Sequence, residues 1–124
     1  MSEQLSGPVH ELSAPTLIEA YGRRDLSPVE VIRSVLGHIE RWEHHIHALF
    51  LLRPELALEQ ARASEARWMR GEPLGPIDGV PVTIKDNIAT RGAPMPLGTA
   101  ATDLAPASFA RSRSVVLFAQ VRRP

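Results

Sequence analysis

A single β-prone run constrains the fold of this chain more than any other feature. It reads Gly79-Val80-Pro81-Val82-Thr83-Ile84-Lys85, and its β-branched apolar residues favour a strand inside a sheet. A strand needs hydrogen-bonding partners, so one strand alone cannot form a stable fold. Residues 115–121 are the only other convincing candidate. We therefore expect an incomplete α/β fold, in which N-terminal helices lead into one strand of a mixed sheet.

Two helices ahead of the strand are predicted from their start and stop signals. The first, over residues 28–44, begins at a capping box, Ser27-Pro28-Val29-Glu30, and its apolar residues then repeat at helical spacing. The second spans residues 54–70 and ends at Gly71, a residue suited to a left-handed C-cap. The helices thus come first, and the loops and the strand follow.

Two shorter segments are less clearly marked. Residues 13–16 begin a short helix that we expect to end near Gly22. Residues 46–52 are compatible with a short strand or with the end of a helix, and periodicity does not decide between them.

Composition excludes several classes of function. The 124 residues suit one small domain, and 14 basic groups balance 14 acidic ones, which leaves no basic surface for nucleic acid or an anionic membrane. The absence of cysteine excludes disulfides and thiolate metal sites. No secretory signal is apparent, and the apolar runs are too short to cross a bilayer. We expect a soluble, cytoplasmic chain without nucleic-acid or membrane partners.

Two other patterns, one of histidines and one of glycines, resemble ligand-binding sites but have simpler explanations. His44, His45 and His47 could suggest a metal site, but no carboxylate or cysteine completes a ligand set, and a solvated helix end is the better interpretation. Gly71, Gly75 and Gly79 could suggest a phosphate loop, but no Gly-Lys-Ser/Thr follows, and the nearby prolines remove N–H donors. We therefore predict neither a metal nor a cofactor.

The lysine that ends the strand is the main candidate for chemistry. An amine acts as a base only when it is unprotonated, and burial at the end of an apolar strand would lower the pKa of Lys85 from about 10.4. Thr83 lies on the same face of the strand, whereas Asp86 points to the other face. The alternative is a surface lysine that closes an edge strand.

The residues around this lysine carry a family resemblance. The run from Gly79 to Asn87, followed by Thr90 and Gly92, resembles the N-terminal part of the amidase signature family. Members of that family carry a Gly-(Ile/Val)-Pro-x-x-x-Lys-Asp segment, followed by a Thr-x-Gly turn. The preceding helices are similar to theirs as well, so the resemblance extends over roughly residues 12–104.

The resemblance implies hydrolysis of a carboxylic amide by a Ser-cisSer-Lys triad. In such a triad one serine attacks the carbonyl carbon, a second serine on a cis peptide bond relays the proton, and the lysine is the base. The matching lysine is Lys85. The implied partners are a small-molecule amide and, in the full-length relative, a homodimer or an amidotransferase-type complex.

The two serines that the resemblance implies have no counterpart here. They belong to Gly-Ser-Ser-Gly-Gly and Gly-Ser-Asp-x-Gly-Gly segments, and the serines at 108, 112 and 114 lack such neighbours. Beyond Asp103 the chain contains arginines but no acidic residue.

We therefore predict two parts. Residues 1–104 form the N-terminal part of an amidase domain, and residues 105–124 form a divergent basic tail, disordered or produced by a frame shift or gene truncation. Without both serines, we expect the isolated chain to be inactive. The competing hypothesis is a non-catalytic remnant or interaction module, in which helices 28–44 and 54–70 bind a partner.

Overall fold

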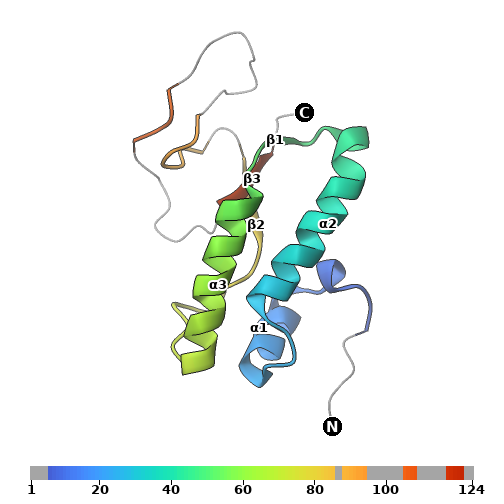
Figure 1. Ribbon diagram of the computed structural model, residues 1–124, viewed down its shortest axis with the longest axis vertical. Helices are drawn as coiled ribbons and strands as arrows, with labels where there is room; N and C mark the ends of the chain where they lie inside the picture. Colours follow the sequence, from blue (N-terminus) through green and yellow to red (C-terminus); the bar gives the residue numbers. More distant parts are fainter. Residues whose placement is uncertain (1–5, 86–87, 95–104, 109–116, 122–124) are drawn as a thin grey trace.

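The computed structural model describes residues 6–85, 88–94, 105–108 and 117–121. Helices α2 and α3 lie side by side, α1 lies near the beginning of α2, and the strands gather beside α3 (Figure 1). The elements in chain order are a 3-10 helix η1 (Val9–Glu11), α1 (Ala14–Arg23), α2 (Pro28–Ile46), β1 (Leu49–Leu52), α3 (Pro54–Arg70), β2 (Val82–Lys85) and β3 (Leu117–Val121).

The capping box predicted for the first long helix is confirmed. Ser27 Oγ accepts a hydrogen bond from the Glu30 N–H, and Glu30 Oε2 accepts one from the Ser27 N–H at 2.8 Å. Helix α2 continues two residues beyond the predicted end at 44 and stops at His47, which has a left-handed backbone. The second long helix, α3, has the predicted bounds, and Gly71 is its left-handed C-cap.

The structure also settles the two shorter segments. Helix α1 ends at Arg23, next to Gly22 as expected, and a left-handed Arg24 closes the last turn through N–H bonds to carbonyls of that turn. The segment 46–52 contains both of the alternatives: Ile46 ends α2, and Leu49–Leu52 form β1.

The strands form a mixed three-stranded sheet in the order β1-β3-β2. The central strand β3 runs antiparallel to β1 and parallel to β2. It lies within the second strand candidate, residues 115–121, and supplies the partner that β2 requires. The fold prediction of helices leading into a mixed sheet is thus confirmed, whereas the domain boundary at residue 104 stays a prediction.

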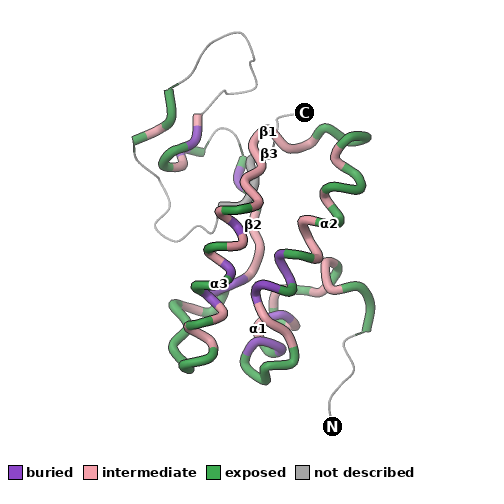
Figure 2. Tube along the Cα trace, viewed as in Figure 1, coloured by how far each residue is buried: buried purple, intermediate pink, exposed green. Residues whose placement is uncertain are grey.

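Most of the buried apolar surface lies between the helices (Figure 2). One cluster joins α2 and α3 through Val29, Ile32, Ala57 and Ala61, and another joins α1 and α2. Burial of apolar surface stabilises a fold by about 25 cal/mol per Å², and these contacts therefore hold the helices together. Among the described residues, no helix combines the length and apolar composition that a membrane crossing requires.

Candidate functional site

Lys85 is the last residue of β2, and its side chain is exposed. Burial alternates along this strand, so that Ile84 is buried while Thr83 and Lys85 lie together on the opposite, exposed face. The expected burial of the lysine is therefore not present within the described residues, because the described part of the chain does not cover this face of β2 at Lys85. Asp86 lies outside the described residues. Lys85 is also the only lysine in the sequence.

A groove of about 400 Å³ opens on this same face of β2. Its lining is mostly apolar and comes from η1, α1, α2, from Val80 and Pro81 just before β2, and from Thr83 within β2. Because Thr83 shares a face with Lys85, the groove and the lysine lie on one side of the strand. An apolar recess beside a lysine is a suitable place for an uncharged substrate group or an apolar segment of polypeptide.

The chain after the lysine makes the turn that the Thr-x-Gly pattern predicts. The Ala93 N–H donates to the Thr90 carbonyl at 3.1 Å, and Gly92 has a φ of +78°. The Arg53 guanidinium, at the start of α3, donates to the Gly92 carbonyl oxygen. This turn is therefore tied to the helical part of the fold.

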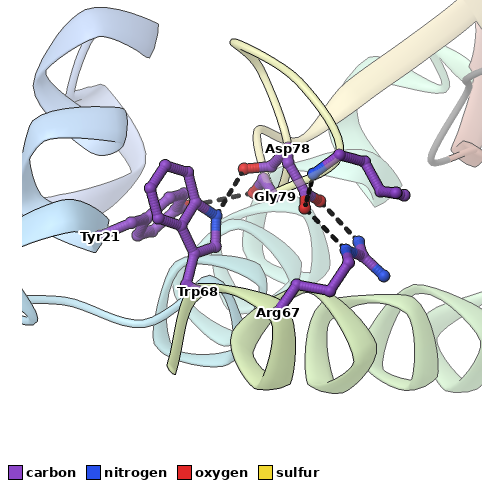
Figure 3. Close-up of polar contacts among 6 residues, drawn as sticks. Tyr21, Arg67, Trp68, Asp78 and Gly79 are labelled. Carbon is purple, nitrogen blue, oxygen red and sulfur yellow. Dashed lines mark hydrogen bonds and ion pairs between the residues drawn. The ribbon is translucent and has the colours of Figure 1, made fainter. Parts of the chain in front are cut away.

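The loop before β2 is held by Asp78, whose side chain is only 3% exposed. Its carboxylate accepts hydrogen bonds from Arg67 Nε at 2.7 Å and Arg67 Nη2 at 2.6 Å, a two-point contact that fixes the orientation of both groups (Figure 3). The Leu74 N–H donates to the same carboxylate at 3.0 Å. One carboxylate thus closes the loop on itself and ties it to α3.

Two aromatic side chains bind the backbone of the same loop. Trp68 Nε1 donates to the Asp78 carbonyl at 3.1 Å, and the Tyr21 hydroxyl donates to the Gly79 carbonyl at 3.0 Å (Figure 3). Their rings also pack together, with centroids 5.8 Å apart. We call Tyr21, Arg67, Trp68, Asp78 and Gly79 the Asp78 cluster.

Sequence reasoning missed this cluster. A tryptophan on a helix is most simply a core or interface anchor, and nothing indicated that Trp68 would bind the loop backbone. The available signal was the Asp78-Gly79 pair, which is typical of turns. Gly79 has a φ of +85° and no room for a Cβ atom. Glycine is therefore required here so that the loop backbone can approach the helices closely, and this explains the residue without a phosphate loop.

The charge of Asp78 makes the stability of the fold depend on pH. Burial alone would raise the pKa of this carboxyl, but the hydrogen bonds from Arg67 and from the Leu74 N–H outweigh it and hold the pKa below its usual value. A carboxyl with a lowered folded-state pKa stabilises the fold above its unfolded-state pKa of about 3.9, and this contribution disappears as the pH falls through the folded-state pKa.

We therefore expect Asp78→Asn to lower the melting temperature at about pH 7, and we expect this difference to shrink as the pH falls below about 3.9 toward the lowered folded-state pKa. Thermal melts of both proteins across this range measure the difference. An equal difference at all pH values would show that the charge of Asp78 does not act in this way.

The histidines at the end of α2 are exposed, and the rings of His44 and His45 lie 3.9 Å apart. Within the described part of the chain, no three potential metal-ligating side chains come together. Trp42, the other tryptophan, is 47% exposed and is therefore not a core anchor.

Comparisons with known proteins give a consistent result. The family model described as Amidase matches residues 30–117. A glutamyl-tRNA(Gln) amidotransferase subunit of Chloroflexus aggregans is 38% identical over 91 residues, which are 73% of this chain and 19% of that protein. The corresponding protein of Salinispora arenicola is 41% identical over 88 residues, 71% of this chain and 18% of that protein. The chain spans about a fifth of the length of these relatives.

Solved structures match the fold as well. A bacterial aryl acylamidase of the amidase signature family superposes with a TM-score of 0.83 and 32% identity, over 95% of this chain and 26% of that chain. A chain from a vestigial protein complex, linked to the origins of an s-triazine catabolic enzyme, has a TM-score of 0.74 and 26% identity, over 80% of this chain and 22% of its own.

Proposed function

Because this chain belongs to the amidase family, we propose that it forms the N-terminal, lysine-bearing part of a site that hydrolyses carboxylic amides. In this proposal Lys85 is the base of a Ser-cisSer-Lys triad. The observation that carries it is the position of Lys85 at the end of β2, between the anchored loop and the anchored turn. The substrate class is a small carboxylic amide.

The remaining parts of the triad are proposed to come from additional polypeptide. The sequence lacks the glycine-rich serine segments, and the exposed Lys85 needs a cover that removes it from water before its amine can work as a neutral base. The apolar groove beside β2 supports this arrangement, because it offers a surface on which such polypeptide can pack. Experiment decides whether this additional polypeptide belongs to the same protein or to a separate chain.

The isolated chain is expected to release no ammonia or amine from simple amides above the rate of a buffer blank. A base without a nucleophile or an oxyanion hole cannot complete acyl transfer. A panel of aliphatic and aromatic amides, assayed for released ammonia or amine, measures this, with Lys85→Ala as the matched control. Turnover that disappears in the Lys85→Ala variant would contradict the expected inactivity.

A second candidate function is a non-catalytic interaction module. It is favoured by the similarity to a chain from a vestigial protein complex and by relatives that are named as amidotransferase subunits. A module of this kind should melt cooperatively as a monomer, whereas a partial domain with open sheet edges should aggregate or lose fixed side-chain packing. Calorimetry combined with light scattering distinguishes the two.

A further inference from the structure

We infer that the Asp78 cluster is a positioning device for Lys85: it fixes where β2 begins and thereby where the lysine at the end of β2 lies. This inference rests on the proposed function only in so far as Lys85 is the base. The contacts themselves stand independently of any activity.

The strand that carries the lysine has few anchors of its own. Ile84 is its only buried residue, and it packs in a small cluster with Ala93 and the partly buried Leu51. Within the described residues, β3 is the only strand that pairs with β2. One buried isoleucine and pairing along one edge are few contacts for a strand, so contacts outside β2 also set its position.

The Asp78 cluster supplies those contacts just before the strand begins. Tyr21 reaches the loop from α1, and Arg67 and Trp68 reach it from α3, so that two helices hold neighbouring peptide units (Figure 3). From Gly79 to Lys85 the chain advances six residues without a further glycine. Such a short, largely extended segment transmits a shift at its first residue to its last.

Tyr21 allows the positioning role to be separated from packing. Its ring belongs to the apolar cluster between α1 and α2. Among the described residues, its hydroxyl makes one hydrogen bond, to the Gly79 carbonyl in the loop. Burial, together with the nearby charge of Asp78, raises the pKa of the Tyr21 hydroxyl, so the group stays protonated and remains a donor. Tyr21→Phe removes this donor and keeps the ring in the core.

The full chain can be tested by nuclear magnetic resonance without any assay of activity. Because Lys85 is the only lysine, labelled lysine gives one side-chain signal that reports its surroundings. In Tyr21→Phe we expect this signal to shift and amide exchange in β2 to rise about five- to tenfold, as the loss of one hydrogen bond predicts. Arg67→Gln removes both hydrogen bonds to the Asp78 carboxylate, so we expect a larger rise there. The amides of Ile32 and Ala61, in the helical core, should keep their exchange rates.

Arg70→Gln is the matched control. Arg70 lies on the same helix and pairs with Glu72, but both side chains are largely exposed, at 59% and 71%. This variant should change neither the lysine signal nor exchange in β2. Arg67→Lys keeps the charge with a less suitable donor geometry, and its exchange rates should fall between those of wild type and Arg67→Gln.

The inference is overturned if Tyr21→Phe leaves β2 exchange and the lysine signal unchanged. It is equally overturned if exchange rises by the same factor at Ile32 and Ala61, because the cluster would then act only on global stability. Neither result bears on whether Lys85 is a base, which is tested separately by replacing that lysine in an active enzyme.

Discussion

Lys85→Arg is expected to lower kcat for amide hydrolysis by about a thousandfold or more in an enzyme that carries this chain as its N-terminal segment. Arginine has a similar length, but its guanidinium does not lose its proton in proteins and cannot act as a base. A suitable host is the bacterial aryl acylamidase, since 95% of this chain superposes on 26% of that enzyme. Rates measured over a range of aryl acylamide concentrations separate kcat from KM.

Three results decide this prediction. The graft with Lys85 should be active, since a graft without activity would contradict the proposal that this segment supplies a working lysine. Arg70→Gln, which changes an exposed charge on α3, should retain the activity of the graft. If Lys85→Arg keeps kcat within about tenfold of the unsubstituted graft, the assignment of Lys85 as the base is wrong.

Gly79→Ala is expected to lower the free energy of unfolding by about 3 kcal/mol, a large part of the stability of a small domain. The backbone of Gly79 has a φ of +85°, where a side chain costs about 1–2 kcal/mol. A Cβ atom there would also lie 2.7 Å from Ser64 Oγ and 2.9 Å from Pro28 Cγ. Both neighbours are buried, and the proline ring cannot rotate away, so overpacking adds about 1–3 kcal/mol.

Two other glycines separate these effects in urea denaturation. Gly71 has a φ of +73° but open space around it, so Gly71→Ala should cost only the backbone strain. Gly37 lies in the middle of α2 with nothing nearby, and Gly37→Ala should stabilise the chain by about 0.5–1 kcal/mol. Equal losses at Gly79 and Gly71 would show that the contacts with Ser64 and Pro28 do not contribute.

Local sequence signals predicted the elements that depend on nearby residues. The capping box at Ser27, the C-cap at Gly71 and the turn at Gly92 all appear where they were expected. Each is determined by hydrogen bonds or backbone angles within a few residues, and such features are visible in a short stretch of sequence. The end of α1 lies one residue beyond Gly22, where Arg24 adopts a left-handed conformation that is uncommon for arginine.

The sequence by itself therefore determined the helices, the lysine-bearing strand and, through its motif, the family. Tertiary structure alone decided how that strand is held and how the lysine is exposed. Tyr21 and Gly79 are 58 positions apart, and Arg67 and Asp78 are 11 apart, so no periodic pattern connects them. Their contacts arise only because α1 and α3 pack against α2 and bring both side chains to one loop. The exposure of Lys85 likewise depends on which face of β2 the described elements cover, and local composition does not decide that.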